Sequence, residues 1–202
     1  MRMPAPSNIP ATKLLDRKID VCFGHGDQNN DGVLEMADAL ALAARIVAYL
    51  HEPFDSPKAT ALFQAFGTFW ETVSQVMDAD KDSRITPLEW RTGLKVFQES
   101  KRFDEGFRPL AEALWSICDR DNNGRVTQKE FAAFHKAFGM SPEKSTEAFE
   151  RLDRDHDGHL SVDELLQAWQ EYYTSTDPEA PGNWLFGDIW ETQIWDGSRV
   201  KI

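Results

Sequence analysis

A twelve-residue acidic pattern occurs four times in this chain of 202 residues, starting at Asp27, Asp78, Asp119 and Asp153. Each copy has oxygen-bearing side chains at positions 1, 3 and 5 and a carboxylate at position 12. A single copy could arise by accident as an acidic turn. Four copies, each flanked by apolar residues at helical i, i+3, i+4 spacing, exclude that explanation. The pattern therefore predicts four repeated helix–loop–helix units.

The spacing within each copy is the one that a calcium loop requires. Ca²⁺ takes six to eight hard oxygen ligands, and short side chains on alternate residues can curl around such an ion. Position 6 must turn with a positive φ, which glycine does at no steric cost. Position 7 binds through its backbone carbonyl, and position 12 supplies two oxygens from the following helix. We therefore predict four EF-hand units. The predicted metal ligands are Asp27, Asn29, Asp31, Val33 and Asp38; Asp78, Asp80, Asp82, Arg84 and Glu89; Asp119, Asp121, Asn123, Arg125 and Glu130; and Asp153, Asp155, Asp157, His159 and Glu164.

The four loops differ in how well they match this pattern. The third and fourth satisfy every position, so we expect both to bind calcium strongly. The first ends in Asp38, one methylene shorter than glutamate, which predicts a six-oxygen site that Mg²⁺ tolerates. The second has Ser83 instead of glycine, and a left-handed residue with a Cβ costs about 1 kcal/mol. We expect up to four Ca²⁺ ions, with Mg²⁺ competing at the first loop.

Apolar residues at position 8 indicate how the loops pair. Leu34, Ile85, Val126 and Leu160 each suit a short strand that joins two loops back to back. The expected fold is therefore all-α, with two pairs of EF-hands packed into one compact body, short β-bridges between paired loops and a C-terminal extension.

A helix N-cap and a charged segment indicate how the chain is divided. Ser141 is a predicted helix N-cap before the fourth hand. The charged segment 99–106 is the expected boundary between the two pairs. We expect an N-terminal EF-hand pair over residues 1–100, a C-terminal pair over 101–176, and a C-terminal extension over 177–202 that packs on the body.

Composition restricts the partners and the compartment. The formal net charge is −12, which disfavours nucleic acid and anionic membranes and suits cations. No stretch approaches the ~20 apolar residues that span a bilayer, and no apolar core of a secretory signal follows Met1. We expect a cytoplasmic protein with Cys22 and Cys118 as reduced thiols. The histidines are scattered and no nucleophile or phosphate-binding motif is present, so we expect no enzyme.

A family resemblance rests on the four loops, the wide gap from Asp27 to Asp78, Asp38 at the end of the first loop, and the segment 177–187. In these features the chain resembles the sarcoplasmic calcium-binding protein family, especially its bacterial calerythrin-like members. That resemblance implies a compact helical fold and calcium buffering, often with Mg²⁺ competing, and it implies that one loop can be silent. Ser83 and the residues after 187 depart from the family pattern.

Three functions remain open from the sequence. A buffer changes shape little on binding calcium, whereas a sensor exposes a groove, commonly Met-rich, to a protein target. The helices here carry aromatic rather than Met-rich faces, which favours a buffer. The same superfamily includes coelenterazine-binding proteins and photoproteins, so a small-ligand carrier is the third candidate. We expect a monomer, and no particular target can be identified.

The C-terminal extension is strongly apolar. Such a segment left in water would be a large exposed patch, which soluble monomers seldom carry. We expect it to be buried against its own body, with a dimer seam as the alternative. Asp196-Gly197 also resembles a weak two-residue hairpin turn. The apolar residues are Trp184, Leu185, Phe186, Ile189, Trp190, Ile194 and Trp195.

Overall fold

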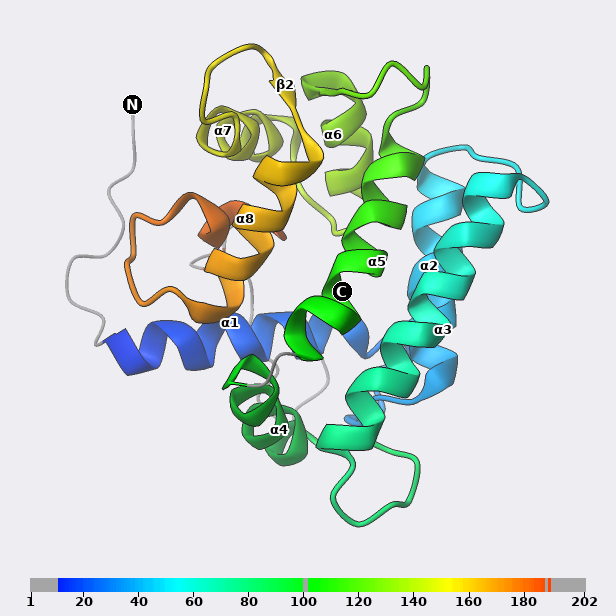
Figure 1. Cartoon of the computed structure of the whole chain (residues 1–202), viewed down its shortest axis with the longest axis vertical. Coiled ribbons are helices and arrows are strands. Elements are labelled where there is room, and N and C mark those ends of the chain that lie inside the picture. The colour runs from blue at the N-terminus through cyan, green and yellow to red at the C-terminus, as the bar shows by residue number, and fades with distance from the viewer. Residues whose placement is uncertain (1–10, 100–101, 188, 190–202) are drawn as a thin grey trace.

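The computed structural model describes residues 11–99, 102–187 and 189, and this part of the chain is almost entirely helical (Figure 1). Four helix–loop–helix units follow one another, and a short 3₁₀ helix comes after the last. The elements are α1 (Ala11–Gly26), α2 (Met36–Tyr49), α3 (Pro57–Met77), α4 (Pro87–Glu99), α5 (Arg102–Cys118), β1 (Val126–Thr127), α6 (Gln128–Lys136), α7 (Pro142–Leu152), β2 (His159–Leu160), α8 (Val162–Thr174) and η1 (Pro181–Trp184).

Local sequence signals explain where several helices begin. Ser56 and Ser141 are the N-caps of α3 and α7; each hydroxyl accepts a hydrogen bond from a backbone amide of the first turn, and a proline follows. Helices α6 and α8 begin with capping boxes, Thr127 with Glu130 and Ser161 with Glu164. The predicted N-cap at Ser141 is confirmed.

The loops pair as the position-8 residues predicted. Val126 lies opposite Leu160 in the antiparallel β1–β2 pair. Leu34 and Ile85 form an isolated bridge between the first two loops, with both N–H···O distances at 2.9 Å. The all-α fold with short bridges between paired loops is therefore confirmed.

A single hydrophobic core joins the two pairs. Helix α3 packs most extensively against α5, and α1 packs against both α4 and α8; Figure 1 shows α1 running across the body next to these two helices. Phe107 on α5 stacks with Phe69 on α3 and with Trp169 and Tyr173 on α8. The aromatic residues thus fill the core, as expected.

The boundary between the pairs is shorter than the sequence indicated. Helix α4 continues to Glu99 and α5 begins at Arg102, so most of the charged segment 99–106 is helical. High charge does not prevent a helix, because Lys, Arg and Glu are good helix formers and can remain in solvent. The division into an N-terminal pair over 1–100, a C-terminal pair over 101–176 and an extension over 177–202 stays a prediction.

The start of the C-terminal extension lies against the body. Helix η1 packs on α7 and α8, and Trp184, Leu185, Phe186 and Ile189 are all buried. Arg151 on α7 lies over the Trp184 ring at 4.3 Å from its centroid. The predicted hairpin turn and the residues Trp190, Ile194 and Trp195 lie outside the described residues.

A buried lysine on α1 anchors this segment, which the sequence did not reveal. Lys18 is fully buried, and its Nζ donates hydrogen bonds to the backbone oxygens of Ser175 (2.6 Å) and Glu171 (3.2 Å) and to Asn183 Oδ1 (3.0 Å). Asn183 in turn donates to Asp177 O at 2.9 Å. The end of α8 and the extension are therefore tied to the first helix by one cation.

Expectations from the sequence also concerned the state of the two cysteines and the presence of a membrane-spanning helix. Cys22 and Cys118 are free thiols, and burial raises the pKa of Cys22 to about 11. Among the described residues, no helix combines the length and the apolar character needed to cross a membrane.

Candidate metal centres

The four loops share one backbone turn around the first aspartate. In every loop the amide at position 6 donates to Oδ2 of the aspartate at position 1, at 3.0 Å. Position 6 has a positive φ throughout, which is 86° at Gly32, 81° at Gly124, 83° at Gly158 and 68° at Ser83. The second loop therefore makes the same turn as the others, although its residue has a Cβ.

Position 4 is also left-handed in every loop, which the sequence analysis missed. The φ values are 58° at Asn30, 62° at Lys81, 57° at Asn122 and 58° at His156. Asn and His are enriched in this conformation, so Asn30, Asn122 and His156 were the available signal, whereas Lys81 gave none. The left-handed residues at positions 4 and 6 curl each loop tightly enough for its side-chain oxygens to converge.

The acid at position 12 bridges both ends of its loop. Glu130 accepts hydrogen bonds from Arg120 N at 3.0 Å and from Thr127 N at 2.9 Å. Glu89 and Glu164 make the equivalent pairs of contacts in the second and fourth loops. Each glutamate therefore acts at once in the cap of the following helix and as the closing carboxylate of the loop.

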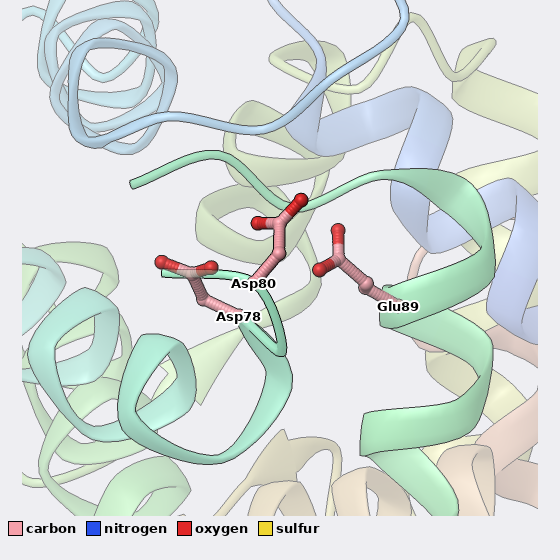
Figure 2. Close-up of side chains that lie close together, drawn as sticks. All are labelled: Asp78, Asp80 and Glu89. Atoms are coloured by element: carbon pink, nitrogen blue, oxygen red, sulfur yellow. The ribbon is translucent and has the colours of Figure 1, made fainter. Parts of the chain in front are cut away.

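Three loops bring carboxylates together closely enough to share an ion. In the second, third and fourth loops, one oxygen from each acid at positions 1, 3 and 12 lies within 4.8 Å of the others. Figure 2 shows this group in the second loop, with Asp78 and Asp80 after α3 and Glu89 on α4. Asp78 Oδ1 is buried and has no hydrogen-bond partner. An all-oxygen donor set with such an orphaned oxygen fits a hard divalent cation.

The first loop differs in its donors. Asn29 occupies position 3, so the carboxylates of this loop lie at positions 1, 5, 9 and 12, with Glu35 at position 9. Asp38 makes the same two contacts as the glutamates, accepting from Gln28 N at 3.1 Å and from Glu35 N at 3.0 Å. No close carboxylate trio comparable to those of the other three loops occurs here in the described part of the chain. The first loop is thus closed in the same way but places its carboxylates at different positions.

Local environment shifts the pKa values of these acids in opposite directions. Burial raises the pKa of Asp27, with like charge on Asp38 and Asp31 adding to the effect, while hydrogen bonds from the Gly32 and Asp31 amides oppose it. Hydrogen bonds from Thr86 lower the pKa of Glu89, which keeps that carboxylate ionised.

The predicted ligands at position 7 would act through carbonyl oxygens, so their side chains are free for other contacts. Arg84 forms an ion pair with Glu35 at 2.8 Å, and Arg125 forms one with Asp157 at 3.1 Å. His159 is half-buried, with its ring Nδ1 3.1 Å from Asp157 O. Coordination by the carbonyls of Val33 and these three residues stays a prediction.

Comparison with known proteins agrees with this geometry. A family model described as an EF-hand domain pair matches residues 107–170. Calerythrin from Saccharopolyspora erythraea is 27% identical over 165 residues, covering 80% of this chain and 93% of that protein. Obelin from Obelia longissima is 35% identical over 83 residues, which are 40% of this chain and 42% of obelin.

Solved structures show the same fold. A Streptomyces coelicolor calcium-binding protein, described in terms of prokaryotic calcium-mediated regulation, superimposes with a TM-score of 0.72 at 29% identity, covering 79% of this chain and 98% of that one. The sarcoplasmic calcium-binding protein of amphioxus matches in fold with a TM-score of 0.70 at 16% identity, covering 87% and 97%. Together with the repeated loops, these likenesses show an EF-hand domain pair at residues 107–170 and a chain similar over most of its length to calerythrin, with the fold of the amphioxus sarcoplasmic calcium-binding protein.

Proposed function

We propose that this protein is a cytoplasmic calcium buffer that acts as a monomer and has no enzymatic activity. The observation that carries the proposal is the gathering of acids at positions 1, 3 and 12 in three loops built on one aromatic core. Bound Ca²⁺ would relieve the repulsion among these carboxylates and stabilise the fold by linkage. Up to four ions are proposed, with the ligands named from the sequence and with Mg²⁺ competing at the first loop.

Two features favour buffering over sensing. A sensor would open an apolar groove to a protein target. Here Trp184, Leu185 and Phe186 of the same chain are buried against the helices. Phe186 contacts Phe138, Trp169 and Tyr172, so this segment belongs to the core. A calcium sensor with a protein target remains the alternative, and the Streptomyces relative's description in terms of calcium-mediated regulation is its support.

A small-ligand carrier is the third candidate function, because the core contains an apolar cavity of about 90 Å³. Its lining includes His25, Trp90 and Trp169, and His25 Nδ1 is buried without a hydrogen-bond partner. A dry cavity of roughly 150 Å³ is what accommodates benzene. A ligand of the size of benzene or larger would therefore have to expand this core, which ranks the carrier below the buffer.

The strongest sites should be the third and fourth loops. Glu130→Gln and Glu164→Gln are each expected to remove one high-affinity site, because an amide cannot supply a charged two-oxygen grip. Calorimetric titration with Ca²⁺ measures the stoichiometry, and unchanged stoichiometry in either variant would contradict the ligand assignment. A hydrophobic dye separates the functions: a buffer should bind no more dye when calcium is added, whereas a sensor should bind more.

A further inference from the structure

Each pair of loops contains one arginine that faces an aspartate of the other loop. Arg125, at position 7 of the third loop, has Nη1 3.1 Å from Oδ2 of Asp157 in the fourth loop. Arg84, at position 7 of the second loop, has Nη2 3.7 Å from Oδ2 of Asp31 in the first loop. Asp157 and Asp31 both occupy position 5. The same contact is therefore built twice, once in each pair of loops.

The register of the β-bridges explains this contact. The bridge at position 8 places position 7 of one loop beside position 9 of its partner, as the pairing of His159 with Thr127 shows. A long side chain at position 7 therefore extends over the neighbouring loop. In the first pair the cross-strand neighbour is Glu35, which binds Arg84 Nε at 2.8 Å. In the second pair it is Ser161, which has no charge, so Arg125 is left to Asp157 alone.

The two oxygens of each aspartate have different partners. Oδ1 of Asp157 accepts a hydrogen bond from His159 N at 2.9 Å, and Oδ1 of Asp31 accepts one from Val33 N at 3.1 Å. Oδ2 of each aspartate faces the arginine of the partner loop. The arginine thus contacts an acid of one loop through its side chain, while its own carbonyl is a predicted ligand of the other loop.

We propose that Arg125 and Arg84 are cross-loop positioning residues that lower the cation affinity of the partner loop and link the two sites of each pair. The inference rests on the proposed function, because it assumes that these loops bind calcium. A guanidinium beside a ligand aspartate repels an arriving divalent cation, and dissolved salt screens that repulsion. In the calcium-free protein the same charge offsets the repulsion among the loop acids, so it stabilises the fold there.

The test measures one site at a time. Asp38→Asn and Glu89→Gln are present in every variant of this comparison, so that the first two loops are weakened throughout. In a Glu130→Gln background the third loop is weakened too, and calcium titration reports the fourth. Adding Arg125→Gln is expected to raise the calcium affinity of the fourth loop roughly 2- to 5-fold at low salt. This range corresponds to the free energy that one exposed ion pair usually contributes. The gain in affinity should shrink at about 0.5 M KCl, because salt screens the interaction. In a Glu164→Gln background, which reports the third loop, the same change should be smaller than about 2-fold.

Arg120→Gln is the matched control. Arg120 is an exposed arginine of the third loop whose side chain forms no ion pair with any residue that the structure describes, so this variant removes the same charge without the contact. It should leave the fourth loop's affinity nearly unchanged. Arg125→Lys keeps the charge and should stay close to the native affinity. Arg125→Gln should also lower the melting temperature in calcium-free buffer more than the control does, whereas a merely structural role would weaken affinity as well as stability.

The first pair gives a second, independent comparison. Because Glu35 holds Arg84, the effect of Arg84→Gln on the first loop should be smaller than that of Arg125→Gln on the fourth. Lys81, an exposed cation of the same loop, supplies the control Lys81→Gln. Glu35→Gln should free Arg84 for Asp31 and lower the affinity of the first loop, an effect that Arg84→Gln cancels.

The outcomes separate this inference from the proposed function. If Glu130→Gln and Glu164→Gln leave the calcium stoichiometry unchanged, the loop assignment fails and the inference fails with it. If the stoichiometry falls as expected but Arg125→Gln matches Arg120→Gln, acts mainly on the third loop or lowers the affinity of the fourth, only the cross-loop role is overturned.

Discussion

Ser83 is the residue at which the second loop departs most from its neighbours. Its φ of 68° is left-handed, a conformation that costs a residue with a Cβ about 1 kcal/mol. Ser83→Gly is expected to relieve this cost and raise the calcium affinity of the second loop by up to about fivefold. Site-resolved titration measures the change.

The control for this prediction is the reverse substitution in the third loop. Gly124 has a φ of 81° and no atoms near the position of a Cβ, so Gly124→Ser adds strain without a clash. It should weaken the third loop by a similar factor. An unchanged or lower affinity after Ser83→Gly would show that backbone strain does not limit the second loop.

Asp38 sets the character of the first loop. Its two oxygens already accept hydrogen bonds from Gln28 and Glu35, and it is buried. Asp38→Glu is expected to shift selectivity from Mg²⁺ toward Ca²⁺, because the longer side chain can supply a seventh oxygen. Competition of the two ions at this site, compared with Glu164→Asp in the fourth loop, measures the shift. Identical selectivity before and after the change would contradict this explanation.

At the scale of elements, the contact of α1 with α8 and the extension depends on Lys18. Lys18→Met keeps a long apolar stem but removes the donor to Ser175 O and Asn183 Oδ1, while Glu171 O keeps its hydrogen bond from Ser175 N. Each unsatisfied buried acceptor costs roughly 1–3 kcal/mol, so the free energy of unfolding should fall by more than about 2 kcal/mol. Chemical denaturation in calcium-free buffer measures it.

Lys13 provides the control for Lys18→Met. It is an exposed lysine on the same helix, so Lys13→Met changes the charge equally and should alter stability by less than about 0.5 kcal/mol. Equal effects of the two substitutions would show that the buried hydrogen bonds do not hold the extension.

At the scale of the whole molecule, features set by local sequence could be predicted, whereas particular contacts between distant segments could not. The loops, the bridges at Leu34 and Ile85 and the cap at Ser141 follow from local rules that each unit obeys by itself. The burial of Lys18 could not be foreseen, because lysine is rarely buried and its acceptors lie more than 150 residues away. His135 is similar: it is buried on α6, with Nε2 3.0 Å from Leu185 O in the extension. Contacts between distant segments depend on packing that no single window of sequence contains.

The C-terminal segment is therefore expected to complete the core. Truncation after Ser175 removes Trp184, Leu185, Phe186 and Ile189, and each buried large apolar side chain is worth roughly 1.5–3 kcal/mol. The melting temperature should fall by about 10 °C or more, and calcium-loaded protein should bind more hydrophobic dye, because the contacts of Phe186 with Trp169 and Tyr172 are lost. Truncation after Ile189 is the control, since it keeps these residues and should preserve the core. A dimer seam predicts instead that the shorter protein elutes as a monomer while the full chain elutes as a dimer. If the truncated protein keeps its melting temperature and binds no additional dye, the segment does not complete the core, and its apolar residues serve a partner.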